Sequence, residues 1–304
     1  GLEQSKNLMT VHIAMDAGMP NVIKALDKLG IGKYQPYPAF ALGAGDTTVL
    51  KMVNAYGALA NHGRQHPPSV IDYVQDRRGK VIWRADKRDC TNCNMAEWDG
   101  QPMPRIKPDG QQVMDARTAF QVLHMLTGVV ERGTATRLRD LGLPMFGKTG
   151  TTSGPTNAWF VGGTPEVVAG LYLGFDQPKN LGGWVQGGNT AVPIFRQFVV
   201  ETRKRWRPEL FVAPAGIRMV RIDRASGKRV FDGTAGSDPK AAVIWEAFKP
   251  DTEPPRITRA DEVEKKRAEI IALIRRGRSA VTDAPRKEDE ASEEGFVEEQ
   301  GGIY

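Results

Sequence analysis

The sequence has few of the residues that indicate metal or redox sites. Its 304 residues include two cysteines and four histidines. The cysteines form a single C-x-x-C pair, Cys90 and Cys93, with no histidine nearby. A structural zinc site needs four ligands, so this pair does not predict one. A small local disulfide in an oxidising compartment is the simpler interpretation, with metal binding or free thiols as alternatives.

Long hydrophobic runs are also absent. No stretch of about 18 apolar residues occurs, so the sequence predicts no transmembrane span. Apolar residues make up 40% of the chain and charged residues 26%, which is typical of a globular protein with an ordinary core. The chain opens on Gly1-Leu2-Glu3 without a Met or a signal-like segment, so we expect it to be cut from a longer protein.

The net charge of +6 is unevenly distributed along the chain. Residues 283–304 hold eight acidic and two basic residues, which leaves +12 on the first 282 residues. A basic surface can attract nucleic acid, anionic lipid or an acidic polymer. The Lys and Arg are scattered, however, and no RNA-binding motif is present. We therefore expect a generally basic surface and no nucleic-acid partner.

Hydrophobic periodicity and turn residues predict a mixture of helices and short strands. From about residue 250 the composition shifts to Glu, Lys, Arg and Pro, which predicts a largely disordered tail with one amphipathic helix near 261–275. The other expected helices lie at 8–17, at 22–29 with Asn21 as N-cap, between a Thr47 cap and Gly63, at 115–132 and at 190–205. The expected β elements are a hairpin at 69–83, three antiparallel strands across 145–175, and a smaller segment that joins 218–223 to 229–231.

The segment 145–154 concentrates the residues best suited to chemistry. It contains Lys148-Thr149-Gly150-Thr151, which places a cation and hydroxyls beside a glycine. A lysine next to hydroxyls and accessible backbone N–H groups suits a substrate carboxylate and a developing oxyanion. We expect Lys148 to lie on a strand whose free edge borders a cleft.

The same segment fits a second pattern. Residues 142–149 match the P-loop pattern G-x-x-x-x-G-K-[ST], which binds nucleotide phosphates. A P-loop requires a helix that starts at its Lys-Thr pair, whereas Gly150, Gly154 and Pro155 disfavour a helix there. Nucleotide binding is therefore the weaker alternative.

Two short motifs stand in the order that one group of enzymes uses. Ser5-Lys6-Asn7 matches Ser-x-Asn, and residues 148–150 match Lys-Thr-Gly. These are two of the three motifs of penicillin-binding proteins and class A β-lactamases. Four further segments agree, and with them residues 1–250 resemble the C-terminal part of the transpeptidase domain of class A (bifunctional) penicillin-binding proteins. These segments are Ala41–Val49, Met52–Gly63, Gly128–Ala135 and Asn157–Gly162, the last with Asn where the family often has Asp.

The resemblance implies an α+β fold in which a five-stranded antiparallel sheet, flanked by helices, lies beside a helical lobe. Residues 1–250 would be the transpeptidase (penicillin-binding) domain and 251–304 a charged tail. The implied activity is that of a peptidoglycan D,D-transpeptidase, which cross-links stem peptides through a serine acyl-enzyme and is the target of β-lactams. No cofactor or metal would be needed.

The resemblance also implies a cellular context. The full-length protein would carry a peptidoglycan glycosyltransferase domain and an anchor outside this chain, at the periplasmic face of the bacterial inner membrane. Its partners would be peptidoglycan stem peptides, β-lactam antibiotics and other cell-wall synthesis proteins. Contact with the membrane would occur only through the part of the protein that precedes this chain.

Six residues take roles from the resemblance. Ser5 would relay a proton to the leaving D-alanine, and Asn7 would bind the donor amide and orient the catalytic lysine. Lys148 would supply positive potential in the cleft. The hydroxyls of Thr149 and Thr151 would hold the terminal carboxylate, and Gly150 would leave room for the substrate backbone. The backbone N–H of Thr151 would form half of the oxyanion hole.

The third family motif, Ser-x-x-Lys, is missing ahead of Ser5. The one literal match is Ser237-Asp238-Pro239-Lys240, which lies downstream and contains a proline that disfavours the required helix. We therefore expect the chain to lack its nucleophile and to be inactive alone. A carboxypeptidase or β-lactam sensor would share the same motifs, whereas a β-lactamase would need a deacylating carboxylate that neither Glu97 nor Glu131 supplies convincingly. A non-catalytic binding module is the alternative from another functional class.

Overall fold

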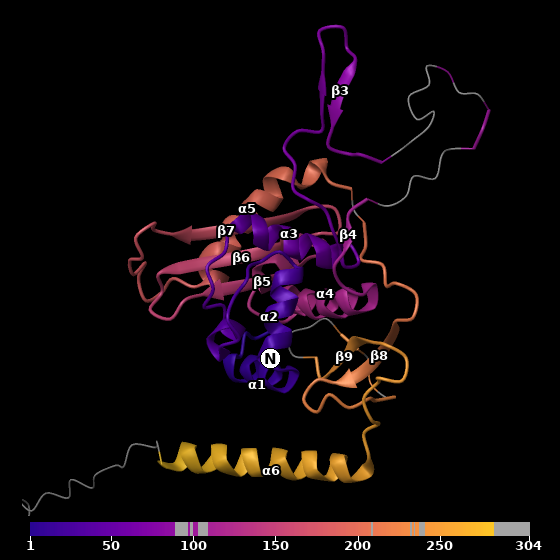
Figure 1. Ribbon diagram of the computed structural model, residues 1–304. Helices are drawn as coiled ribbons and strands as arrows, with labels where there is room; N and C mark the ends of the chain where they lie inside the picture. Colours follow the sequence, from indigo (N-terminus) through magenta and orange to yellow (C-terminus); the bar gives the residue numbers. More distant parts are fainter. Residues whose placement is uncertain are drawn as a thin grey trace, which may run out of the picture. The chain divides into compact units, whose positions relative to one another are not determined.

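The computed structural model describes residues 1–88, 97, 100–102, 109–207, 209–231, 233, 235–236 and 241–282 (Figure 1). The chain divides into two compact units, Gly1–Pro254 and Pro255–Tyr304. The longer helices are α1 (Asn7–Ala17), α2 (Met19–Lys28), α3 (Val49–Ala60), α4 (Ala116–Glu131), α5 (Val192–Thr202) and α6 (Arg259–Thr282). Short helical turns are η1 (Pro38–Leu42), η2 (Thr136–Leu141), η3 (Gly187–Ala191) and η4 (Arg203–Arg205).

The strands form four small antiparallel sheets within the described residues, with strand orders β1-β4, β2-β3, β5-β6-β7 and β8-β9. Helices and antiparallel sheets together confirm the expected α+β class. The strands are β1 (Arg64–Gln65), β2 (Tyr73–Gln75), β3 (Val81–Arg84), β4 (Gln111–Gln112), β5 (Phe146–Thr151), β6 (Asn157–Gly163), β7 (Val168–Gly174), β8 (Arg218–Asp223) and β9 (Val243–Phe248).

The three-stranded sheet carries the Lys-Thr-Gly motif. Its register pairs Lys148 of β5 with Val161 of β6, and Val161 with Gly170 of β7. Gly154, with φ of 66°, lies in the turn between the first two strands. The predicted meander across 145–175 is confirmed, and β5 is an edge strand of this sheet. The described residues place three strands in it, where the resemblance implies five.

The core of the first unit lies around this sheet, with α4 packed on β5 and α3 on β7. Because strand side chains alternate between faces, β6 buries Phe160, whose ring centroid lies 4.5 Å from that of Phe195 in α5. Burial of such aromatic side chains supplies much of the stabilisation of a core. The largest fully buried side chains are Phe146, Phe160, Leu138, Val129, Val192 and Val199.

Helix ends differ from the sequence-based predictions by a residue or more. The predicted N-caps Thr47 and Asn21 are wrong, because Thr48 accepts the hydrogen bond from Lys51 N at 3.2 Å, while Asn21 lies inside α2. The Thr47 hydroxyl instead donates to the carbonyl of Ile31. The apolar residues Ile194, Phe195, Phe198 and Val199 suggest one inward face for α5, but only Phe195 and Val199 are buried, while Ile194 is 44% exposed and Phe198 40%.

The predicted partner of 218–223 is also wrong. Strand β8 pairs with β9 along its whole length, with Ile222 opposite Ile244, whereas 229–231 contributes one isolated bridge, from Arg229 to Ile222. Helix α6 contains the predicted 261–275 and continues to Thr282. The cysteine pair, the segment 237–240 and residues 283–304 lie outside the described residues, so the predictions made for them stay untested.

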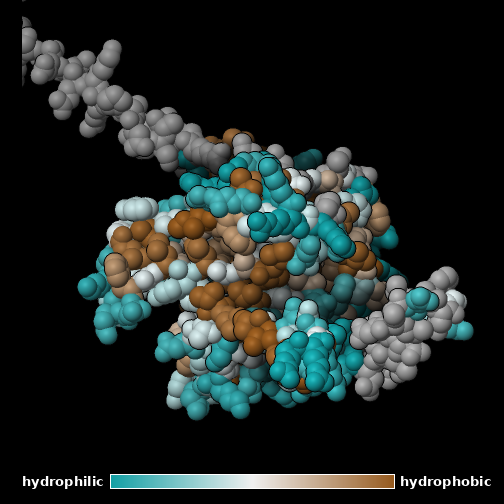
Figure 2. All heavy atoms as spheres, turned by 90° about the horizontal axis from the view of Figure 1, so that it is seen from above, coloured by the Kyte–Doolittle hydropathy of each residue, from teal (hydrophilic) through white to brown (hydrophobic). Residues whose placement is uncertain are grey.

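Several apolar side chains remain at the surface, where they gather between polar ones (Figure 2). Helix α1 exposes Leu8, Met9, Ile13 and Met15. Hairpin β2–β3 exposes Tyr73, Val74, Ile82 and Trp83, with further apolar residues just before it. Among the described helices, none is long and apolar enough to cross a membrane.

Candidate active site

The site is organised around one contact between the two sequence motifs. The Lys148 ammonium donates to Ser5 Oγ at 2.8 Å and to the carbonyl of Thr149 at 3.0 Å. The two motifs are 143 residues apart in sequence, so this contact is a product of the fold. An ammonium has three donors, and with two engaged the third is available to a ligand oxygen.

The charge of Lys148 has no counter-ion within the described part of the chain. No carboxylate described in the structure lies within ion-pair distance of this side chain, which is half-buried between β5 and the Ser5 segment. Burial disfavours the charged form and lowers the pKa of the Lys148 ammonium. An unneutralised cation in a partly desolvated site is suited to an anionic ligand.

Ser5 lies in a tight turn that ends where α1 begins. Its φ is 52°, in the left-handed region that residues other than glycine seldom adopt. Two backbone hydrogen bonds close the turn. Ser5 N donates to the Leu2 carbonyl at 3.2 Å, and Lys6 N donates to the Gly1 carbonyl at 2.8 Å. Unusual backbone conformations of this kind cluster at functional sites. The turn therefore presents the Ser5 hydroxyl toward Lys148.

The other predicted site residues are only partly brought together. Asn7 is the exposed first residue of α1, and no hydrogen bond joins it to Lys148 in the described structure. The buried Thr149 hydroxyl contacts Thr134 Oγ1 at 2.7 Å. The Thr151 hydroxyl accepts a hydrogen bond from Gly187 N at 2.9 Å. A hydroxyl that accepts can still donate, so Thr151 keeps a hydrogen for a ligand carboxylate.

Gly150 lies where two backbones approach each other closely. A Cβ on Gly187, in η3, would be 2.7 Å from the Gly150 carbonyl oxygen and 3.0 Å from Thr149 Cβ. Only glycine fits at Gly187, so the start of η3 lies directly against β5. Sequence spacing carries no indication that Gly187 lies against β5, so this residue cannot be assigned to the site from the sequence alone.

Sequence reasoning also missed Glu3, Arg132 and Thr134. Arg132 pairs with Glu3 of the Ser5 turn, and the Thr134 hydroxyl contacts Thr149 of the Lys-Thr-Gly strand. The segment Gly128–Ala135 supported the family resemblance, but no residue in it received a role. Arg132 and Glu3 are 129 residues apart in sequence, and nothing in the sequence indicates that they form a pair.

The structure excludes the P-loop alternative. Lys148 and Thr149 lie inside β5, and the described residues that follow form a turn and then β6. A P-loop lysine instead lies at the start of a helix, where backbone N–H groups surround the phosphates. Residues 142–149 therefore match the P-loop pattern without forming one.

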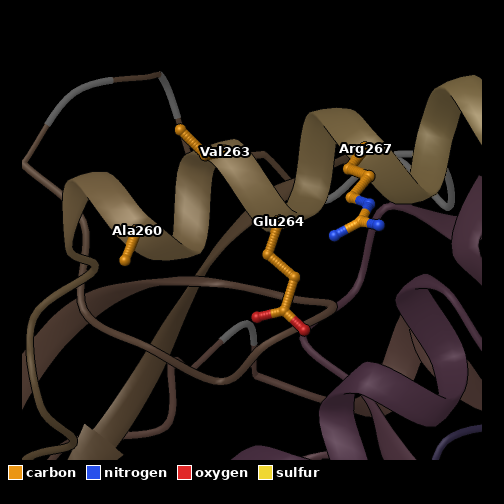
Figure 3. A pocket seen from close by; sticks show the side chains of 4 residues that line it. All are labelled: Ala260, Val263, Glu264 and Arg267. Atoms are coloured by element: carbon orange, nitrogen blue, oxygen red, sulfur yellow. The ribbon is translucent and has the colours of Figure 1, made fainter.

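A separate pocket lies along α6 in the second unit. Ala260, Val263, Glu264 and Arg267 line it (Figure 3). All four come from one helix, and none is a nucleophile. Among the described residues no group of three or more His, Cys, Asp or Glu could hold a metal ion. The chemically equipped site in the described structure is therefore the one around Lys148.

Comparison with known proteins places the same residues in one family. A family model described as the penicillin binding protein transpeptidase domain matches residues 1–199. Penicillin-binding protein 1A of Rickettsia bellii is 36% identical over 252 residues, and that of Pseudomonas aeruginosa is 28% identical over 288. The crystal structure of penicillin-binding protein 1A from Haemophilus influenzae superposes with a TM-score of 0.67 at 25% identity.

These similarities cover most of this chain and a minor part of each relative. The alignment with the Rickettsia bellii protein includes 82% of this chain and 31% of that protein. For Pseudomonas aeruginosa the shares are 84% and 34%, and for the Haemophilus influenzae structure 85% and 40%. The chain thus spans about a third of the length of the relatives in the sequence comparison.

Proposed function

Because the chain belongs to the penicillin-binding protein transpeptidase family and corresponds to part of the transpeptidase region of class A members, we propose that the complete protein is a peptidoglycan D,D-transpeptidase. It joins stem peptides through a serine acyl-enzyme and is acylated by β-lactams. The observation that carries this proposal is the hydrogen bond from Lys148 to Ser5, since it unites the Lys-Thr-Gly and Ser-x-Asn motifs in one site. We assign the chemistry to residues 1–250 and none of it to the charged tail.

The reaction is an acyl transfer in two steps. A serine Oγ attacks the carbonyl carbon between the two D-alanines, and the peptide C–N bond breaks as the terminal D-alanine leaves. Ser5, held by Lys148, relays a proton to that leaving amine. The amine of a second stem peptide then attacks the ester, forms the cross-link and releases the serine.

The remaining site residues bind and orient the donor peptide. The third hydrogen of Lys148 and the hydroxyl of Thr151 meet the terminal carboxylate, with Thr149 in support. The Thr151 N–H forms half of the oxyanion hole, and Gly150 leaves room for the substrate backbone. Asn7, exposed at the start of α1, binds the donor amide and orients the catalytic lysine.

The serine nucleophile and its activating lysine belong to the part of the protein that this sequence does not include. Two observations support this assignment. The relatives are about three times as long as the matched region, with 31% of the Rickettsia bellii protein aligned. Helix α1, directly after Ser5, also exposes four apolar side chains that a neighbouring element of a domain would cover.

The wider role follows from the same family membership. We propose that the complete protein also carries a peptidoglycan glycosyltransferase domain and an anchor that hold it at the periplasmic face of the inner membrane. Its partners are then stem peptides, β-lactams and other cell-wall synthesis proteins. These assignments rest on the class A relatives.

A peptide-exchange assay tests the function directly. The complete protein is incubated with a synthetic peptide ending in D-Ala-D-Ala and with a free D-amino acid as acceptor. We expect release of D-alanine, an exchange product, and an acyl-enzyme visible by mass spectrometry. Hydrolysis without exchange would make the protein a carboxypeptidase. Absence of both release and adduct would contradict the proposal and favour a non-catalytic binding module.

The pH dependence of acylation should report on Lys148. Burial lowers its pKa, so the folded protein loses this charge at a lower pH than an exposed lysine, which titrates near 10.4. The acylation rate should therefore fall with rising pH, with a midpoint below about 10.4. The measurement is the acylation efficiency k2/Ks for a β-lactam across alkaline pH, where k2 is the acylation rate constant and Ks the dissociation constant of the non-covalent complex. Lys148→Arg stays charged in this range and should lose this fall. An identical alkaline limb in both proteins would refute the assignment.

A further inference from the structure

The turn that carries Ser5 is fastened to the end of α4 by a buried ion pair. Arg132 Nη2 lies 2.7 Å from Glu3 Oε1, and Arg132 Nε donates to the same oxygen at 3.2 Å. The Gln4 side chain donates to the Arg132 carbonyl at 2.7 Å. The Arg132 side chain is 5% exposed and that of Glu3 16%. Shielding from water makes such charge-assisted bonds directional and strong.

Backbone contacts hold the same turn at close range. Thr134 N donates to the Glu3 carbonyl at 3.2 Å. A Cβ on Gly133 would lie 2.3 Å from that carbonyl oxygen, and one on Gly128 would lie 2.1 Å from Glu3 Oε1. At Gly133 the obstacle is backbone, so only glycine lets the turn approach the end of α4 this closely, whereas at Gly128 a side chain would displace the Glu3 carboxylate from Arg132.

The same segment also holds the strand that carries Lys148. The hydroxyls of Thr134 and Thr149 lie 2.7 Å apart, and Thr149 is the neighbour of Lys148 on β5. Thr134 thus contacts the Ser5 turn through its backbone N–H and β5 through its side chain. A shift of this residue would alter the separation of the two motifs.

We propose that Glu3, Arg132 and Thr134 are positioning residues that set the distance between Ser5 and Lys148. This inference rests on the proposed acylation chemistry and adds residues outside its three motifs. None of the three touches the Ser5 hydroxyl or the Lys148 ammonium, so they act by fixing the segments that carry these groups. The four-carbon stem of Lys148 is flexible. The 2.8 Å contact therefore depends on where the Ser5 turn and the backbone of β5 are held.

The proposal predicts which kinetic constant changes. Misplacing the relay by a fraction of an ångström weakens proton transfer in the transition state, but leaves the contacts of the bound ligand largely in place. Glu3→Gln and Thr134→Val, each in the complete protein, should therefore lower the acylation rate constant k2 about tenfold. Ks should stay within about twofold, and Thr134→Ser, which keeps the hydroxyl, should restore k2.

The experiment measures k2 and Ks by stopped-flow labelling with a fluorescent penicillin, with thermal unfolding recorded for each variant. The matched control is Thr156→Val, which removes the exposed 2.9 Å hydroxyl pair of Thr156 with Thr152 in the turn after β5. It should leave k2 unchanged. If Glu3→Gln lowers the unfolding temperature markedly, the comparison of Thr134→Val with Thr134→Ser tests the proposal instead, because Thr149 keeps its place on β5 in both variants.

The outcomes separate this inference from the proposed function. A labelled parent with parental k2 in both variants would overturn the positioning role alone. An effect confined to Ks would assign Thr134 to ligand binding through Thr149 and overturn it as well. A complete protein that the penicillin does not label would overturn the proposed function, and the positioning role with it.

Discussion

Replacing Lys148 by alanine in the complete protein should lower the rate of serine acylation by roughly two to three orders of magnitude. Loss of one electrostatic stabiliser in a shielded site typically costs about 2.7–4 kcal/mol of transition-state free energy. Lys148 fits that description, since it is half-buried, donates to Ser5 and pairs with no carboxylate in the described structure. Acylation by a fluorescent penicillin, followed with time, measures the effect.

The controls separate this role from a structural one. Lys51→Ala removes an exposed lysine from α3 and should change the rate by less than about twofold. Thr151→Val should slow acylation less than Lys148→Ala, because the backbone N–H that faces the oxyanion remains. Thermal unfolding of the Lys148→Ala protein should match the parent closely. A variant that acylates at the parental rate would rule the assignment out.

The 304-residue chain by itself should form no covalent adduct with penicillin, while the complete protein should be labelled stoichiometrically. In the described structure the Lys148 ammonium donates to Ser5, and a serine hydroxyl that only accepts from an ammonium is a weak nucleophile. Labelling of the isolated chain should therefore be absent rather than reduced. Intact-protein mass spectrometry after incubation with penicillin measures it.

This experiment needs evidence that the isolated chain is folded. A cooperative thermal transition and a circular dichroism spectrum with both helix and strand content would provide that evidence. Preincubation with unlabelled penicillin should abolish labelling of the complete protein. Stable labelling of the isolated chain, mapped to Ser237 or to any other serine in it, would show that the chain holds its own nucleophile.

Local patterns in the sequence predicted most of the elements around the site. Short apolar runs separated by turn residues predicted β5 and β6, and the apolar periodicity of 115–132 predicted α4, because both patterns follow from backbone geometry. Helix caps were less predictable. Thr47 and Thr48 are chemically identical, and only the fold determines which hydroxyl meets the first free N–H.

Contacts between distant segments were beyond sequence reasoning. The family resemblance named Ser5 and Lys148, and the structure brings them together. The pairing of β8 with β9 was missed because a nearer apolar segment at 229–231 offered the same β propensity. The pair of Glu3 with Arg132 was missed because two opposite charges on one chain carry no information about their distance in space.

The separation of 143 positions between Ser5 and Lys148 also bears on when the site forms during folding. Closing so long a loop has an entropic cost that local helices such as α1 and α4 do not incur, so such contacts form late. For the Ser5 turn to contact β5, α4 must have formed so that Arg132 can pair with Glu3. The sheet that contains Lys148 must have formed as well. Penicillin labelling is therefore also a probe of complete folding, since a chain that stops before residue 148 contains only one side of the site.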